Sequence, residues 1–276
     1  MPGADGASEL RGHPAQGVAC YLLNLDRSAG RLVQSTARLN AACLDPIRVP
    51  GVDGSALATE QRGLADRRTS RRLTGRALSD GEVGCYLGHL RALERMLEDG
   101  VPHALVCEDD VRPAPVLGEL CLGLSRLGPL GLDWKVAILA KPAGRLFTEV
   151  AAVDTRTRSF RVQLAHYPPM NAWANLWTRD GAAEMLAAFG RPVEPWDHAV
   201  RRFAQRSDGA LSVDPSPILP PEDASEIDRR GSRGTRGPVY RWRKWRRLSQ
   251  QKARARQLMR DAANAHSTAL QLAPET

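Results

Sequence analysis

Residues 78–110 read LSDGEVGCYLGHLRALERMLEDGVPHALVCEDD, and this stretch predicts a helix, a strand and an acidic cluster in that order. Ser79 and Glu82 have the spacing of a capping box, so we expect a helix that begins there and continues to Glu98, with leucines along one face. Residues 103–107 (HALVC) have the apolar composition of a buried strand. That strand runs directly into an EDD sequence, which places three carboxylates at its carboxyl end.

The same alternation of strand and helix extends to both sides of this stretch. Val18–Leu25 is an apolar run suited to a buried strand, and Asp26–Cys43 has apolar residues at helical spacing. Further strands are expected at Ile47–Val52, Trp134–Ala140 and Phe160–His166, and further helices at Asp180–Phe189 and Pro195–Gln205. Alternating strands and helices predict an α/β fold with a largely parallel central sheet.

Composition divides the chain into four parts. Residues 1–17 are rich in Gly and Pro and are expected to be a disordered N-terminus, and 18–221 are expected to form the folded domain, with four prolines within 212–221 ending it. Residues 222–238 have the composition of a flexible linker, and 239–276 predict a basic C-terminal helical tail.

The positive charge is concentrated in one segment. The sequence has 39 Lys and Arg against 31 Asp and Glu, but 13 of the basic residues lie between Arg229 and Arg260, where no acidic residue occurs. The rest of the chain is mildly acidic, so nucleic acid is not expected as the main partner. No apolar run approaches the roughly 20 residues of a membrane-spanning helix, and no secretory signal pattern is visible, so we expect a cytoplasmic protein.

The cysteine pattern indicates neither a disulfide framework nor a zinc site. The five cysteines are an odd number and form no C-x-x-C pair, so reduced and mostly buried thiols are expected. The six histidines do not supply the short Cys or His spacing that is typical of zinc sites.

The basic segment has the composition of a helix that lies on an anionic membrane. Trp242 and Trp245 are three residues apart among Arg and Lys, and Leu248 and Leu258 add apolar surface. We therefore expect residues 240–260 to bind the inner face of a membrane peripherally. The alternatives are a solvated helix packed on its own domain, and RNA binding through stacking of Trp and Arg on bases.

Three acidic residues directly after a strand are the strongest chemical signal in the sequence. On extended backbone, Glu108 and Asp110 project to the same side and could hold one divalent cation together. Carboxylate oxygens suit Mg²⁺ or Mn²⁺, and ligands of open α/β sheets bind at this end of the strands. The alternative is a polar turn with solvated carboxylates.

Several segments, in the same order along the chain, resemble glycosyltransferase family 25, the relatives of lipopolysaccharide-biosynthesis and collagen galactosyltransferase enzymes. They are the GC-x-x-x-H and EDD pairing within 78–110, NLDRSAGR at Asn24–Arg31, GVDG at Gly51–Gly54, Gly181-Ala182, and Pro195-Trp196-Asp197. The resemblance implies a GT-A type nucleotide-sugar-binding fold, a UDP-sugar donor, Mn²⁺ or Mg²⁺ as cofactor, and inversion at the anomeric carbon.

The resemblance also implies roles for individual residues. Glu108 and Asp110 would hold the metal, Asp110 most directly, and the cation would offset charge on the departing UDP. The donor-binding residues would be Asn24, Arg27, Arg31, Asp53, Gly54, His89 and Asp109. Asp197 would be the base that activates the acceptor hydroxyl, with Glu222 and Asp223 as weaker alternatives.

Structural roles compete with these assignments. A loop arginine is commonly a solvated charge, Asp53 can form an ordinary Asx turn, and Asp197 can complement a helix dipole. His89 can be a packed histidine that anchors its helix. Gly84 and Gly88 predict close approach of that helix to another backbone.

The expected activity is transfer of a galactose-like hexose from a UDP-sugar to a saccharide or glycolipid acceptor, such as a lipopolysaccharide-type glycan. Three positions depart from the family pattern: Gly88 stands where a serine is usual, and Asn175 and Thr178 stand where an aromatic residue and a serine are usual. The alternative function is that of a catalytically inactive family member, which binds nucleotide-sugar or a membrane as a partner protein.

Overall fold

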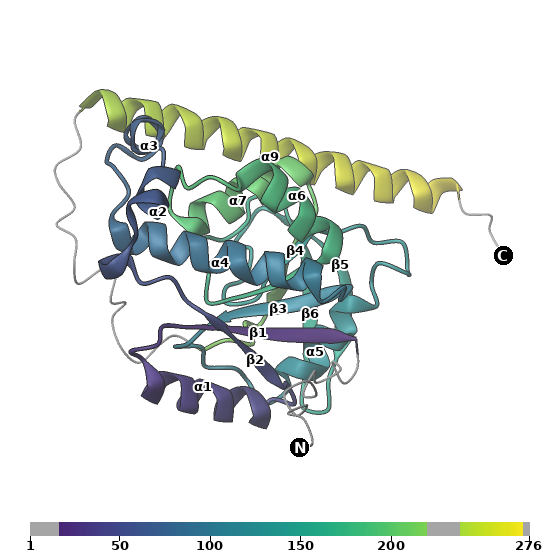
Figure 1. Ribbon diagram of the computed structural model, residues 1–276. Coiled ribbons are helices and arrows are strands. Elements are labelled where there is room, and N and C mark those ends of the chain that lie inside the picture. Colours follow the sequence, from purple (N-terminus) through teal and green to yellow (C-terminus); the bar gives the residue numbers. More distant parts are fainter. Residues whose placement is uncertain (1–16, 220–237, 273–276) are drawn as a thin grey trace, which may run out of the picture.

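The computed structural model describes residues 17–219 and 238–272, and it places one mixed sheet between two layers of helices (Figure 1). One face is covered by α4 (Asp80–Glu98), α6 (Arg179–Phe189) and α7 (Trp196–Ser207). The other face is covered by α1 (Ala29–Ala41) and α5 (Leu117–Ser125). An apolar core fills the space between the sheet and each layer, and the α/β class predicted from the sequence is confirmed.

Strand β1 (Val18–Asn24) is buried on both faces, as a strand between two helical layers must be. Tyr21 belongs to the core on the α4 side, whereas its neighbour Leu22 belongs to the core on the α1 side. β1 pairs in parallel with β2 (Pro46–Pro50) and with β3 (His103–Glu108). The continuous apolar run of this segment is typical of such a central strand.

The remaining strands do not continue this parallel pattern. They are β4 (Val136–Ile138), β5 (Phe147–Asp154), β6 (Ser159–Ala165), β7 (Ala174–Thr178) and β8 (Ala210–Asp214). The strand order is β2-β1-β3-β7-β4-β8-β6-β5. Strand β7 is antiparallel to β3 and β4, and β6 is antiparallel to β5 and β8, while β4 and β8 are parallel.

The prediction of a largely parallel sheet is therefore wrong for this half of the sheet. Strands β5 and β6 are joined by a short turn, and two neighbouring strands joined in that way can only be antiparallel. Three strands of this half are not among those expected from periodicity: β5, of which only one residue is buried, β7, and β8, which runs into a proline-rich segment.

Helix α4 begins where the capping box predicted it. The Ser79 Oγ accepts a hydrogen bond from the Glu82 N–H at 3.2 Å, and the Glu82 carboxylate accepts one from the Ser79 N–H at 2.9 Å. The shorter elements before it, which were not predicted from the sequence, are η1 (Gly54–Ala56), α2 (Thr59–Leu64) and α3 (Arg67–Thr74). Helix α5 was not predicted either.

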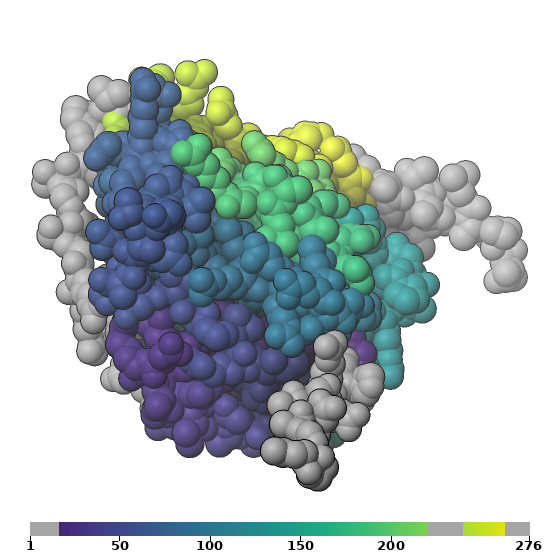
Figure 2. Space-filling model, in the orientation of Figure 1, coloured from purple at the N-terminus to yellow at the C-terminus, as the bar shows by residue number. Residues whose placement is uncertain are grey.

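Helix α9 (Pro238–Leu272) runs along the upper edge of the molecule, with its first turns beside α3 (Figures 1 and 2). Arg247 donates to the Leu73 carbonyl at 3.0 Å, and Arg254 pairs with Asp208 at 2.9 Å. One face of α9 is therefore packed on the folded part. Among the described residues, no helix has the length and apolar character needed to cross a membrane.

Two predicted segments lie outside the described residues. They are most of the N-terminus expected to be disordered and almost all of the linker expected at 222–238, which includes Glu222 and Asp223.

Candidate functional site

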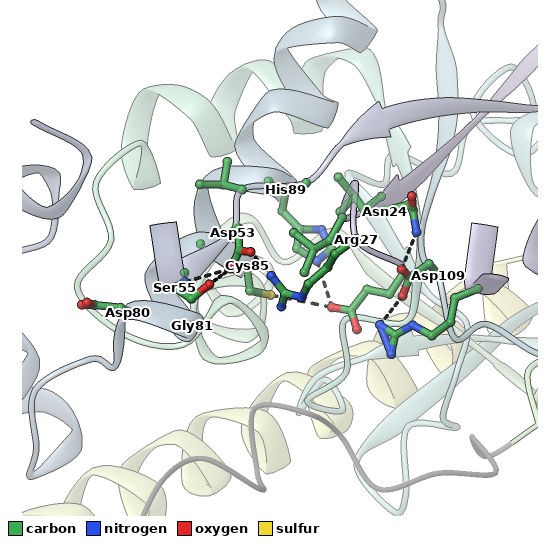
Figure 3. A pocket seen from close by; sticks show the side chains of 18 of the residues that line it. Asn24, Arg27, Asp53, Ser55, Asp80, Gly81, Cys85, His89 and Asp109 are labelled. Carbon is green, nitrogen blue, oxygen red and sulfur yellow. Dashed lines mark hydrogen bonds and ion pairs between the residues drawn. The ribbon is translucent and has the colours of Figure 1, made fainter. Parts of the chain in front are cut away.

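A pocket of about 480 Å³ opens at the carboxyl ends of β1 and β3, beside η1 and the first turns of α4 (Figure 3). Because β1 and β3 are parallel neighbours, the side chains that follow them converge on one edge of the sheet. The sequence-predicted residues in the pocket wall are Asn24, Arg27, Arg31, Asp53, Gly54, His89, Glu108, Asp109 and Asp110. Of the predicted site residues that the structure describes, Asp197 alone does not line it.

Asp109 is the buried anchor of this wall. Its carboxylate accepts a hydrogen bond from Asn24 Nδ2 at 2.7 Å and forms an ion pair with Arg31, and its backbone carbonyl accepts from Ser35 Oγ at 2.7 Å. Burial raises the pKa of Asp109, against the opposing influence of Asn24 and Arg31. Asp109 therefore links the end of β3 to β1 and α1. Both of its carboxylate oxygens are bonded to other side chains of the protein.

Asp110, the next residue, differs from Asp109 in its hydrogen bonding. Its Oδ1 is buried without a hydrogen-bond partner among the described residues. Burial, and then the charge of Glu108, raise the pKa of Asp110 to about 6. A buried carboxylate oxygen with no partner, beside a second carboxylate, fits a divalent cation bound through hard oxygen ligands.

The backbone brings these acids together in a different way from the one predicted. Strand β3 ends at Glu108, and the Val111 N–H donates to the Glu108 carbonyl at 3.1 Å, so residues 108–111 form a turn. The prediction that Glu108 and Asp110 share one side of an extended strand is therefore wrong in its geometry. Both side chains nevertheless line the pocket, because the turn lies at its rim.

His89 and Cys85 form the α4 side of the wall. His89 Nε2 lies 3.1 Å from Glu108 Oε1, and Cys85 Sγ lies 3.8 Å from the same oxygen. The ring of Trp196 stacks on the His89 ring, with centroids 4.8 Å apart and planes at 11°. His89 is buried, as the packed-histidine interpretation expects, but it also faces an acidic residue of the pocket.

Cys85 was not among the site residues predicted from the sequence. The available signal was its position four residues before His89, because residues at that spacing share one face of a helix. Its thiol pKa is raised well above the ordinary value, chiefly by burial and next by the charges of Glu108 and Asp197.

The loop after β2 forms the third side of the pocket. Asp53 caps η1 by accepting from the Ser55 N–H at 2.8 Å and the Ser55 Oγ at 2.7 Å, so the Asx-turn interpretation is confirmed. Its other oxygen forms an ion pair with Arg27. A Cβ atom on Gly84 would lie 2.4 Å from the Val52 carbonyl oxygen, which confirms the predicted close approach of α4 to this loop.

Gly88 differs from Gly84 in this respect. A Cβ atom on Gly88 would have Val52 N as its nearest neighbour at 3.7 Å, an ordinary van der Waals distance. Close backbone approach therefore does not require glycine at position 88, and the prediction is wrong there.

Asp197 lies in the first turn of α7, next to the tryptophan that stacks on His89. Its negative charge helps to raise the pKa of the Cys85 thiol. The structure does not bring it into the pocket with the other predicted residues.

Comparison with known proteins agrees with the motifs of this region. Residues 18–119 match the family model described as glycosyltransferase family 25 (LPS biosynthesis protein). A glycosyltransferase 25 family member of Anopheles gambiae is 30% identical over 113 residues, which are 38% of this chain and 18% of the relative. Human procollagen galactosyltransferase 2 is 28% identical over 131 residues, which are 44% of this chain and 20% of the relative. The chain thus spans about a fifth of the length of these relatives.

Proposed function

We propose that this protein, whose residues 18–119 match glycosyltransferase family 25, is a metal-dependent, inverting glycosyltransferase. It moves a galactose-like hexose from a UDP-sugar to a saccharide or glycolipid acceptor, such as a lipopolysaccharide-type glycan. The observation that carries this proposal is the pocket itself, in which two arginines and the three acids after β3 meet at the carboxyl edge of parallel strands. We also infer a GT-A type fold, with β2, β1 and β3 as its nucleotide-binding part.

The two arginines are the groups in this pocket suited to a diphosphate. A guanidinium binds phosphate oxygens through paired N–H donors. Arg27 is paired with Asp53 and Arg31 with Asp109, so each guanidinium is already held at the pocket wall by a carboxylate. Binding a diphosphate would require these ion pairs to be shared or exchanged, while Asp53 remains an acceptor for uracil or ribose.

Glu108 and Asp110 are the residues that would hold Mn²⁺ or Mg²⁺. Asp110 has a buried oxygen with no partner among the residues that the structure describes, and Glu108 supplies a second carboxylate in the same pocket. When bound, such a cation offsets the negative charge of a departing diphosphate. The protein's own contribution is to keep both carboxylates in place: Asp109 anchors the turn, and His89 orients Glu108.

Asp197 is our candidate for the base that removes the acceptor hydroxyl proton. Because it lies outside the pocket wall, the acceptor would approach from the side of α7. The absence of Asp197 from the pocket wall favours one alternative, a protein that binds nucleotide-sugar but has no base in place for turnover.

The test is release of UDP from UDP-galactose and related donors, with saccharide acceptors, in the presence and absence of Mn²⁺. We expect metal-dependent release by the native protein and none by Asp110→Asn. Asp133→Asn is the matched control, because the Asp133 side chain is 86% exposed and lies outside the pocket. Nucleotide binding without release for any donor would favour the inactive alternative.

We propose further that α9 binds anionic membranes. Trp242 and Trp245 are 56% and 65% exposed, and the described part of the helix surrounds them with exposed Arg and Lys. Sedimentation with anionic vesicles should be lost when both tryptophans become alanine and kept in Leu130→Ala, an exposed apolar residue elsewhere. Salt-sensitive binding to RNA with no vesicle binding would replace the membrane with RNA as the partner.

A further inference from the structure

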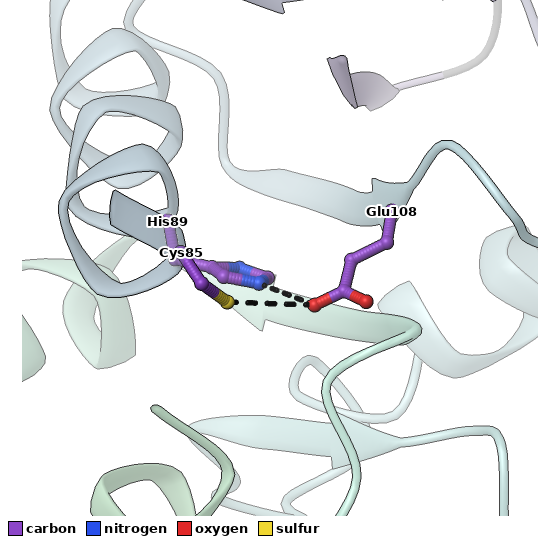
Figure 4. A group of neighbouring side chains, drawn as sticks. All are labelled: Cys85, His89 and Glu108. Carbon is purple, nitrogen blue, oxygen red and sulfur yellow. Dashed lines mark hydrogen bonds and ion pairs between the residues drawn. The ribbon is translucent and has the colours of Figure 1, made fainter. Parts of the chain in front are cut away.

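Three side chains of different chemistry meet at one point of the pocket wall (Figure 4). Cys85 and His89 are one turn apart on α4, and Glu108 reaches them from the end of β3. The Cys85 Sγ, a ring nitrogen of His89 and a carboxylate oxygen of Glu108 all lie within 4.8 Å of one another. All three residues line the pocket, so the point where they meet is accessible to a ligand in it.

The spacing of these atoms fits a tetrahedral metal. Bonds from zinc of about 2.3 Å to sulfur and about 2.0 Å to nitrogen and oxygen put the ligand atoms of a tetrahedron about 3.3 to 3.6 Å apart. The structure has 3.1 Å between His89 Nε2 and Glu108 Oε1, and 3.8 Å between Cys85 Sγ and Glu108 Oε1. These two separations need shifts of only a few tenths of an ångström, whereas Cys85 Sγ and the His89 ring nitrogen, which lie within 4.8 Å of each other, would have to approach by up to about 1.3 Å to bind one ion.

We propose that Cys85, His89 and Glu108 bind a thiophilic divalent cation of the Zn²⁺ class, with a fourth coordination position open to the pocket. Thiolate and imidazole ligands favour Zn²⁺ over Mg²⁺ or Mn²⁺, which prefer oxygen ligands. Three protein ligands with one open position are typical of zinc sites that bind an exogenous ligand. The site does not depend on the protein being a glycosyltransferase, and no motif of C-x-x-C type indicates it in the sequence.

The protein holds the ligands in place before any metal arrives. Trp196 stacks flat on the His89 ring and limits its rotation. Gly84, next to Cys85, packs directly on the Val52 carbonyl, which fixes this turn of α4. Binding forms a metal–sulfur bond and releases the thiol proton of Cys85 to solvent, while His89 binds as the neutral imidazole and Glu108 as the carboxylate.

The site shares Glu108 with the oxygen pair assigned to Mn²⁺ or Mg²⁺ above. One carboxylate 3.1 Å from His89 is poorly placed to serve two cations fully. The two classes of cation should therefore compete, with the thiophilic ion moving the glutamate towards α4.

Titration of the purified whole chain with Co²⁺, followed by absorption spectroscopy, tests this site. Tetrahedral Co²⁺ bound to a thiolate gives a sulfur-to-metal charge-transfer band and intense visible bands, and Zn²⁺ should displace both. Cys85→Ser should lose the charge-transfer band. Cys43→Ser should keep it, because Cys43 is an exposed cysteine outside the pocket.

Glu108→Gln provides a second variant that leaves the thiol and imidazole in place. It should weaken Co²⁺ binding by at least about tenfold, since even the loss of an outer partner of a metal ligand has an effect of that size. Absence of the charge-transfer band in the native protein would overturn the proposal, as would an equal band in Cys85→Ser. Neither result bears on UDP binding, which is measured separately.

Discussion

The two halves of the sheet differ in how their carboxylates are paired. The parallel half consists of β2, β1 and β3, and the antiparallel half contains β7, β4, β8, β6 and β5. At the end of parallel strand β3, Asp110 has a buried oxygen without a partner among the described residues. At the end of β8, Asp214 lies directly opposite Arg161 of antiparallel β6 and forms an ion pair with it. In this pair of examples, Asp214 is neutralised across neighbouring strands, whereas Asp110 lines the pocket with one oxygen unpaired among the described residues. That difference is what makes the parallel edge the place to look for a ligand.

The largest effect expected outside the parallel half concerns Asp197, the proposed base. Asp197→Asn should lower turnover by about 100-fold or more, because general-base catalysis typically contributes at least that much, while donor affinity changes little. Steady-state kinetics with UDP-sugar and acceptor separates the two quantities. An unchanged turnover would limit Asp197 to stabilising the start of α7.

The next effect compares one glycine from each half. A Cβ would lie 2.4 Å from the Val52 oxygen at Gly84 and 2.2 Å from the Lys135 oxygen at Gly181. Each Gly→Ala variant should lose about 1 to 3 kcal/mol of unfolding free energy through overpacking. Only Gly84→Ala should also weaken UDP binding, since Gly84 lines the pocket and Gly181 does not. Denaturant unfolding and calorimetry would show whether this distinction holds.

An effect of similar size compares Asp110 and Asp214 directly in metal-free protein. Since the folded-state pKa of Asp110 is raised to about 6, its ionisation opposes folding at pH 7. Asp110→Asn should therefore stabilise the protein by up to about 3 kcal/mol at pH 7. The gain should shrink as pH falls below 6 and disappear below the ordinary carboxyl pKa of 3.8, where the carboxyl group is protonated in both the folded and the unfolded state.

Asp214→Asn should change the free energy of unfolding in the opposite direction. It breaks an exposed ion pair, so it should cost at most about 1 kcal/mol. Thermal unfolding in a chelator would detect both changes, and a destabilised Asp110→Asn variant would contradict our description of the pocket edge.

The smallest effect is expected at Gly88. A side chain there meets only ordinary contacts, so Gly88→Ser should change stability by less than about 0.5 kcal/mol. It would place a hydroxyl in the pocket wall. A measured loss above about 1 kcal/mol would show that α4 is packed more tightly than the distances indicate.

Local signals in the sequence predicted much of the parallel half. The capping box at Ser79 and Glu82 is formed, and the apolar run of β1 is a central strand. Pairing direction depends on contacts between distant residues, which is why the reversed strands were not predicted. Strand β5 was missed because its half-exposed residues give a weak alternation.

In the candidate site, too, local sequence patterns predicted some residues, whereas those that depend on contacts between distant segments were missed. Eight of its nine predicted pocket residues come at or after the ends of the parallel strands β1, β2 and β3, and the ninth, His89, reaches the pocket from α4. Cys85 could not be recognised from local spacing alone, since its partner Glu108 follows more than twenty residues later on another element. Asp197 was predicted from a resemblance, and it is not among the residues that line the pocket.

Calorimetric titration with UDP, with and without Mn²⁺, tests the central claim most directly. We predict that native protein binds UDP in a metal-dependent way and that Asp110→Asn loses this binding, while Asp133→Asn keeps it. Metal-independent binding, equal in native protein and Asp110→Asn, would contradict a nucleotide-diphosphate site at the end of β3.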